Sequence, residues 1–248
     1  MTHSFIKLMS KKGVLLRNYT QNIDSLERVA GITSDKLVEC HGCFSHCHCT
    51  RCNVNYFDKV TGEFCDSCSN DSSKKRSRVK AAVVLYGENL KTKFTSNFKT
   101  ESAAADLCIV IGTSLRVPPV STIPSLVSAS TPRILINNER AGCFESAGLT
   151  AVGDSCATIT EEDDESNDDK ESDGFSMEEK EDRAAGNFIM LGSCDEECVR
   201  LLARMFGWDK ELNEERDLLL KEISRGGIDM KQIKKEAFDD FIRHSDVE

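Results

Sequence analysis

The chain has 248 residues, enough for one or two domains with a buried core. Its formal net charge is −10, but residues 161–182 alone carry 13 acidic and 2 basic side chains, so the remainder is close to neutral. A near-neutral body argues against a large phosphate-neutralising surface, so we do not expect nucleic acid as a partner. No apolar run approaches the roughly 18 residues of a membrane span, and the N-terminal residues have no signal-peptide pattern. We therefore expect a soluble intracellular protein that makes no membrane contact.

The first half of the chain alternates apolar segments with stretches of helical character. Residues 3–11 predict a helix that stops at Gly13. Short apolar runs without strong alternation predict strands buried on both faces, at residues 14–16, 81–86, 107–111 and 133–136. Helical crossovers between them could come from residues 89–105 and 120–129. This order predicts an α/β fold with a parallel sheet.

The second half is interrupted by an acidic segment. Residues 153–187 contain hardly any large apolar side chains, so we expect them to be disordered. A helix is expected to resume at Ser193 and to end before Gly207. Two further amphipathic helices are predicted at residues 211–223 and 229–244. They could pack on the body or form a loosely attached extension.

Seven of the twelve cysteines fall within residues 40–68. Cys49 and Cys52 form one C-x-x-C pair, Cys65 and Cys68 form a second, and 12 residues separate the pairs. Two such turns can place four thiolates around one zinc ion, which predicts a structural site closed to substrate. Disulfides are the alternative, and the missing secretory context argues against them. Nearby side chains are also competent ligands and leave the exact set open: Cys40, Cys43, His46, Cys47 and His48.

Residues 19–24 follow the first predicted strand with a run of polar side chains. In open α/β sheets, ligands bind at the carboxyl ends of strands, so this segment is a candidate binding site. The alternative is a turn in which Asn22 and Asp24 bond their own backbone.

Taken together, six motifs in this order resemble the sirtuins, the NAD-dependent protein deacylases. The similarity covers about residues 2–145 and 188–212. The motifs are Leu15-Leu16-Arg17-Asn18-Tyr19-Thr20-Gln21-Asn22-Ile23-Asp24, His41-Gly42 ahead of the cysteine pairs, Val84-Leu85-Tyr86-Gly87-Glu88, Gly112-Thr113-Ser114-Leu115, Leu135-Ile136-Asn137-Asn138-Glu139 and Gly192-Ser193-Cys194-Asp195. The resemblance implies a Rossmann-like, doubly wound parallel sheet with an inserted small zinc-binding module.

The resemblance also implies roles for individual residues. His41 would be the general base that acts on a ribose hydroxyl of NAD, a task that suits an imidazole titrating near neutrality. The alternative is that His41 is merely a neighbour of the zinc site. Cofactor contacts would come from Gln21, Asn22, Asp24, Gly112, Thr113, Ser114, Asn137, Glu139 and Cys194.

The implied reaction moves the acyl group of an acyl-lysine to ADP-ribose and releases nicotinamide. Val84 and Tyr86 would wall the tunnel for the lysine stem, while Gly87 and Glu88 would pair with the substrate backbone. The partners would be acetylated-lysine proteins or peptides, histones among them. Zn²⁺ on Cys49, Cys52, Cys65 and Cys68 would take no part in bond making.

The chain departs from the family pattern at its start. A complete sirtuin begins with a strand and a Gly-Ala-Gly-x-Ser turn that cradles the pyrophosphate, followed by a flexible cofactor loop, and neither occurs here. We therefore expect an N-terminally truncated nucleotide fold. A catalytically inactive, zinc-stabilised interaction module is the alternative function.

The expected organisation is a partial Rossmann-like domain at residues 1–39 and 77–208, broken by the acidic insert at 153–187. The zinc module would span residues 40–76, and the helical extension residues 209–248. The location would be the nucleus or the cytoplasm, because residues 74–78 could be either a nuclear address or a basic edge of the zinc module.

Overall fold

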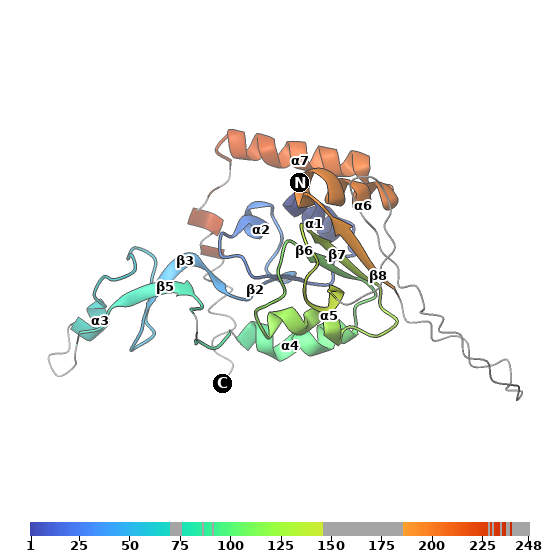
Figure 1. The fold of residues 1–248 in the computed structure, drawn as a ribbon. Helices are drawn as coiled ribbons and strands as arrows, with labels where there is room; N and C mark the ends of the chain where they lie inside the picture. Colours follow the sequence, from blue (N-terminus) through green and yellow to red (C-terminus); the bar gives the residue numbers. More distant parts are fainter. Residues whose placement is uncertain are drawn as a thin grey trace, which may run out of the picture. The chain divides into compact units, whose positions relative to one another are not determined.

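The computed structural model describes residues 1–69, 76–85, 87–90, 92–145, 186–227, 229, 231–233, 235–236 and 239. It divides into two compact units (Figure 1). The first unit comprises Met1–Thr2 and Phe98–Asp209, and the second comprises His3–Asn97 and Lys210–Glu248. The strands in the described residues form three sheets, one in the first unit and two in the second.

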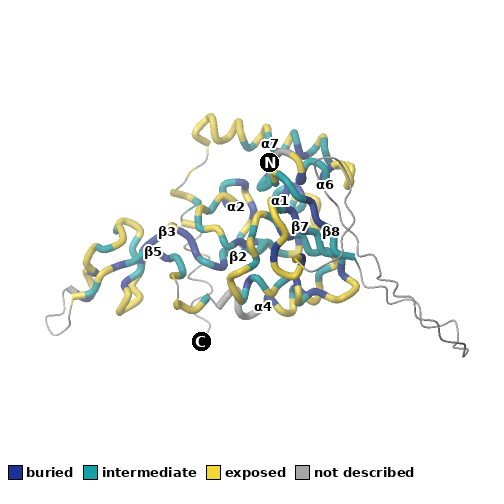
Figure 2. The backbone as a smooth tube through the Cα atoms, in the orientation of Figure 1, coloured by how far each residue is buried: buried dark blue, intermediate teal, exposed yellow. Residues whose placement is uncertain are grey.

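The first unit is built on a parallel sheet in the order β6-β7-β8. The strands are β6 (Cys108–Ile111), β7 (Arg133–Asn137) and β8 (Asn187–Leu191), each rich in the branched or apolar side chains that suit a covered sheet. Val110, Leu135, Phe144 and Ile189 form the centre of the core, and β7 and β8 are among the deeply buried parts of the backbone (Figure 2).

Helices in the first unit flank this sheet. Between β6 and β7 lie a 3-10 turn (Val120–Thr122) and α5 (Ile123–Leu126), and a second 3-10 turn (Gly142–Phe144) follows β7. After β8 come a π-helical turn (Cys194–Cys198) and α6 (Val199–Met205). In Figure 1, α5 and α6 lie on opposite sides of the sheet, as in a doubly wound arrangement. The helix α4 (Thr92–Ala103) precedes β6.

The second unit contains a two-stranded parallel sheet and its covering helices. β1 (Asn18–Thr20) pairs with β2 (Leu37–Glu39), and α2 (Leu26–Val29) lies between them in the chain. The apolar face of α1 (Thr2–Lys11) packs through Ile6 and Met9 against a small core that includes Leu37. The helix α7 (Asp209–Ser224) belongs to this unit from Lys210 onward and carries the buried Leu212.

The other sheet of the second unit is antiparallel, in the order β4-β3-β5. Its strands are β3 (Gly42–Cys49), β4 (Asn55–Tyr56) and β5 (Val79–Val83), and the short helix α3 (Asp66–Ser69) lies between β4 and β5 in the chain. β5 pairs with β3 from the Cys49–Val79 pair to the Gly42–Val83 pair, so this sheet continues to Val83.

The α/β class and the parallel pairing predicted from the sequence are confirmed, and residues 107–111 and 133–136 form β6 and β7. One strand prediction is wrong, and a second is correct for the strand at residues 81–83 but wrong for its sheet. Residues 14–16 are not a strand, because Val14 and Leu16 are exposed and only Leu15 faces the core. Residues 81–86 overlap β5, which belongs to the antiparallel sheet rather than to a covered parallel one.

Two other predictions fall largely outside the described residues. These are the acidic segment, apart from residues 186 and 187, and most of the helix predicted at residues 229–244. Asn187, which we placed in the acidic segment, instead opens β8. Among the helices that the structure describes, none has the length and apolar content needed to cross a bilayer.

Candidate metal centre and active site

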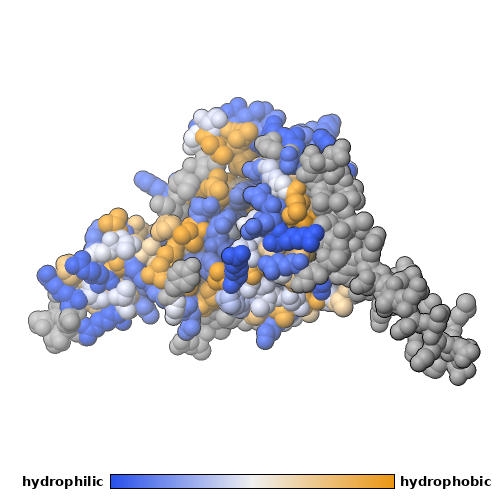
Figure 3. Space-filling model, in the orientation of Figure 1, coloured by the Kyte–Doolittle hydropathy of each residue, from blue (hydrophilic) through white to orange (hydrophobic). Residues whose placement is uncertain are grey.

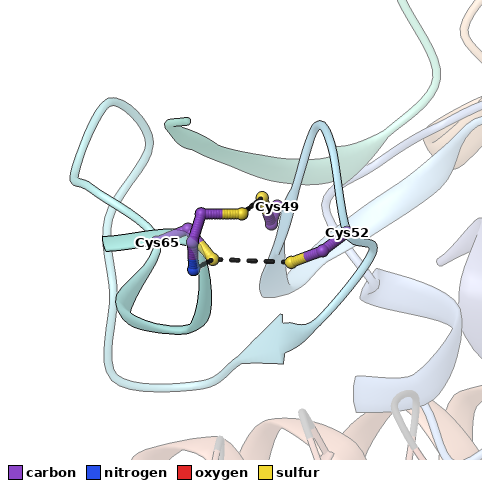
Figure 4. Close-up of side chains that lie close together, drawn as sticks. Cys49, Cys52 and Cys65 are labelled. Atoms are coloured by element: carbon purple, nitrogen blue, oxygen red, sulfur yellow. Dashed lines mark hydrogen bonds between the residues drawn. The ribbon is translucent and has the colours of Figure 1, made fainter. Parts of the chain in front are cut away.

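Four thiol groups converge at the end of the zinc module. Cys49 lies at the end of β3, Cys52 in the turn that follows, Cys65 just before α3 and Cys68 within α3. Their sulfur atoms all lie within 4.8 Å of one another, and Figure 4 shows the side chains of Cys49, Cys52 and Cys65 pointing toward a common centre. The Cys49–Cys68 and Cys52–Cys65 sulfur pairs are 3.8 and 3.5 Å apart.

These distances fit a tetrahedral zinc site. With Zn–S bonds of about 2.3 Å, the edges of a regular tetrahedron of sulfurs are about 3.8 Å long. A disulfide would require about 2.05 Å between sulfurs, so neither pair is a disulfide. The Arg51 N–H points at the Cys49 sulfur at 3.4 Å, the Cys68 N–H points at the Cys65 sulfur at 3.4 Å, and the Tyr56 hydroxyl lies 3.2 Å from the same atom. Such contacts stabilise thiolates, so the donor set suits Zn²⁺.

The other cysteines near this centre have different partners. The Cys43 thiol contacts the Ser45 hydroxyl at 3.2 Å, and the Cys40 thiol contacts the Val38 carbonyl at 3.6 Å. Burial raises the pKa of the Cys40 thiol to about 12, so this group stays protonated at neutral pH. The ligand set left open by the sequence is therefore narrowed to the two C-x-x-C pairs.

His41 lies where the two-stranded parallel sheet meets the antiparallel one. It follows β2 and immediately precedes Gly42, the first residue of β3. Its Nδ1 atom lies 3.0 Å from the backbone carbonyl oxygen of Gln21, which follows the neighbouring strand β1. A carbonyl can only accept, so Nδ1 carries the proton and Nε2 of the neutral ring is left with its lone pair. His41 is half-buried.

The backbone of His41 is also bonded to the segment that follows β5. The Val84 N–H donates to the His41 carbonyl at 2.8 Å, one residue beyond the Gly42–Val83 pair of the β3–β5 ladder. The sequence placed His41 and Val84 in separate motifs, and the structure brings them into direct contact. Tyr86, the other residue that we expected to line the lysine tunnel, lies outside the described residues.

The polar residues after β1 have mixed surroundings. Asn22 and Asp24 are exposed, and Gln21 is half-buried beside His41. The Asp24 carboxylate accepts a hydrogen bond of 3.0 Å from the Leu26 N–H at the start of α2. For Asp24 this is the local turn that the sequence analysis gave as the alternative to a binding site. The turn uses one oxygen of the Asp24 carboxylate.

In the first unit, three sequence motifs meet at the carboxyl ends of the parallel strands. Gly112 follows β6 with a φ of +61°, and a Cβ built there would lie 3.9 Å from the Cys194 sulfur, which follows β8. The Asn137 amide, at the end of β7, donates to the carbonyls of Thr113 at 3.1 Å and Glu139 at 2.9 Å. Ser114 and Glu139 are exposed beside them.

This end of the sheet has the features of a nucleotide site. The ligand position in open α/β folds is the edge at which Gly112, Asn137 and Cys194 lie. Gly112 has a positive φ and no side chain, so a flat ligand can approach its backbone closely. Burial raises the pKa of the Cys194 thiol, with a smaller contribution from Asp195, so Cys194 offers a neutral contact.

Sequence reasoning missed two ion pairs in the second unit. Arg28 in α2 pairs with Glu39 at the end of β2 at 2.8 Å, and the two side chains are only 4% and 9% exposed. Lys80 in β5 pairs with Glu88 at 2.8 Å. No sequence motif contains Arg28, Glu39 or Lys80, because each of them pairs with a residue from a different element. The only sequence sign of such an ion pair is a charged residue within an otherwise apolar segment.

The fold and these sites define an α/β protein with a parallel sheet and a four-cysteine centre that can hold zinc. Residues 1–119 match the model of the Sir2 family. The NAD-dependent protein deacetylase sirtuin-2 of Danio rerio is 35% identical over 244 residues, which are 94% of this chain and 55% of that protein. The chain is thus similar to the Sir2 family, the sirtuins, over residues 1–119 by the family model and over most of its length by this relative.

Other relatives match over different lengths. The NAD-dependent deacetylase sir2D of Dictyostelium discoideum is 46% identical over 146 residues, 56% of this chain and 26% of that protein. The NAD-dependent protein deacetylase hst2 of Schizosaccharomyces pombe is 31% identical over 245 residues, 95% of this chain and 61% of that protein. The chain thus spans between about a quarter and three fifths of the length of these relatives.

Proposed function

We propose that this chain carries the catalytic residues of an NAD-dependent protein-lysine deacetylase. The observation that supports this most directly is the bond between His41 Nδ1 and the Gln21 carbonyl. It fixes the tautomer that a general base requires and joins the two motifs that would face the cofactor ribose. The names of the relatives point to the same activity.

His41 would act as the base of the reaction. Bound NAD supplies an activated ribose that can accept the acyl group and release nicotinamide. Nε2 of His41 would take the proton from a ribose hydroxyl, while the Gln21 carbonyl stabilises the charge that appears on the ring. The imidazole needs no metal for this role, and the closed four-sulfur centre would stabilise the fold without entering the chemistry.

The cofactor contacts would come from the two sets of strand ends. We assign Gln21, Asn22 and Asp24 to the nicotinamide and its ribose. The adenosine portion would be held by residues that follow β6, β7 and β8: Gly112, Thr113, Ser114, Asn137, Glu139 and Cys194.

The substrate would be an acetylated lysine in an extended peptide. Val84 would line the path of the lysine stem together with Tyr86, and the backbone of Gly87 and Glu88 would pair with the peptide as an added strand. Backbone pairing predicts tolerance of many sequences, with histones among the candidate substrates. The proposed location is intracellular, in the nucleus or the cytoplasm, with no nucleic-acid or membrane partner.

Incubation of the full, zinc-loaded chain with NAD and an acetyl-lysine peptide tests this function. Nicotinamide and deacetylated peptide should appear in equal amounts. His41→Ala should lower kcat by about 10²–10⁴-fold, the range for loss of a general base. His3→Ala, on α1, is the matched control and should keep the wild-type rate. If the wild-type chain releases no nicotinamide, or His41→Ala matches it, the proposal is wrong and an inactive binding module becomes the better account.

A further inference from the structure

The segment that follows β5 is closed by one carboxylate oxygen. Oε2 of Glu88 accepts a hydrogen bond of 3.0 Å from the Leu85 N–H and a charged one of 2.8 Å from the Lys80 ammonium. In return, the Glu88 N–H donates to the Leu85 carbonyl at 3.0 Å. Gly87 has a φ of +86°, a conformation that a glycine adopts without strain. These bonds define a closed turn between Leu85 and Glu88.

Lys80 ties this turn back to its own strand. The Lys80 Nζ atom also donates to the Val83 carbonyl at 2.8 Å, so one ammonium group bridges the last residue of β5 and the far end of the turn. The Leu85 N–H and the Lys80 ammonium together lower the pKa of the Glu88 carboxyl, which is therefore ionised at neutral pH. Lys80 is 16% exposed and Glu88 40% exposed.

As a result, three consecutive residues are each held by a different partner. Lys80 holds the carbonyl of Val83, His41 accepts from the N–H of Val84, and Glu88 accepts from the N–H of Leu85. The backbone beside the proposed general base is thus fixed by the side chains of Lys80 and Glu88 and by the backbone carbonyl of His41.

We propose that Lys80 and Glu88 are positioning residues for the acyl-lysine peptide. This inference rests on the proposed function, because it assumes that the peptide adds to the backbone of this turn. Strand addition depends on N–H and C=O groups that already point the right way, and ordering them beforehand reduces the entropy lost on binding. The Glu88 carboxylate acts through Leu85 and Lys80 rather than by contact with the substrate.

A purely structural role would have a different signature. Ion pairs as exposed as this one contribute little to the free energy of unfolding. Losing the pair should therefore leave the chain folded and loosen only the turn. Weaker peptide binding without a loss of stability therefore indicates a positioning role, whereas a loss of stability indicates a purely structural role.

The test uses Glu88→Gln and Lys80→Met, which remove one charge each and keep similar side-chain length. With the full, zinc-loaded chain, the KM for an acetyl-lysine peptide should rise about three- to five-fold, the fold-change that matches the contribution of a partly exposed ion pair. The KM for NAD and the melting temperature should stay at their wild-type values. Lys12→Met and Glu211→Gln break a comparable 3.0 Å pair between the residue that follows α1 and a residue of α7, and they should leave both KM values unchanged.

The effect of the double variant of Lys80 and Glu88 on KM should be smaller than the product of the two single effects, because both changes break the bond that the two side chains share. Hydrogen exchange at the Val84 and Leu85 amides tests the geometry without turnover, and it should accelerate in both single variants. Unchanged exchange, or a KM that stays at the wild-type value in an active chain, would overturn this inference alone. Absence of turnover in the wild-type chain would overturn the proposed function alone.

Discussion

Removal of zinc should unfold the antiparallel sheet of the second unit, because the thiolates supply most of its core. The buried cluster of this module consists of Cys47, Cys49, Cys65, Cys68 and Val79, and three of these five residues are zinc ligands. Apolar and polar side chains are interspersed on its surface (Figure 3), where Phe44, Phe57 and Val60 are exposed.

The magnitudes decide the outcome. Burial of Val79 contributes about 1.5–3 kcal/mol, whereas structural zinc bound by small zinc-finger domains contributes about 10–16 kcal/mol at neutral pH. The apolar contacts that remain after chelation cannot replace that free energy. We therefore expect β3 and β5 to lose their ladder when the metal leaves.

The assay combines metal release with hydrogen exchange. Titration with a strong chelator should release one zinc ion per chain, and amide protection in β3 and β5 should fall in the same concentration range. Cys52→Ala removes the exposed ligand and should abolish stoichiometric zinc binding. Cys143→Ala removes an exposed cysteine of the first unit and should leave zinc binding intact. Full protection of β3 and β5 after complete metal removal would refute this reasoning.

Two further substitutions test the packing of each unit. Arg28→Met leaves the Glu39 carboxylate buried without its partner and should lower the free energy of unfolding by about 3–5 kcal/mol in urea denaturation, and a loss below about 1 kcal/mol would contradict the burial of the pair. In the first unit, Gly142→Ala places a Cβ 2.7 Å from the Cβ of Leu115 at a φ of +56°. It should destabilise the chain by about 1–3 kcal/mol, and a melting temperature equal to the wild type would show that Leu115 can move aside.

The zinc ligands and the strands β6 and β7 were predicted correctly because each depends on residues that are close together in the sequence. The spacing of the two C-x-x-C pairs needs only two tight turns to bring the sulfurs together, and the structure places them within 4.8 Å. Likewise, β6 and β7 are continuous apolar runs in a parallel sheet, so their apolar residues alone predict buried strands.

The parts that failed depend on pairing between distant segments. The run at residues 81–86 looks like a covered strand, yet β5 pairs antiparallel with β3, whose paired residues lie 30 or more positions earlier in the chain. No local pattern distinguishes the two arrangements, because both use apolar side chains. The bonds of Lys80 to Val83 and Glu88 were invisible for the same reason: a lysine in a strand carries no sign of where its ammonium group will find an acceptor.

A zinc centre with no chemical role can still control the geometry of the base. β3 runs from Gly42, next to His41, to the ligand Cys49, and β5 runs back from Val79, opposite Cys49, to Val83, opposite Gly42. The metal fixes one end of this ladder, and the bond from Val84 to the His41 carbonyl closes the other. Loss of the metal should therefore free the backbone of His41 even though the Nδ1 bond to Gln21 does not involve the zinc module. Chelation should then accelerate exchange at the Val84 amide, far along the sheet from the sulfurs, and protection at that amide in the metal-free chain would show that the two ends of the ladder are independent.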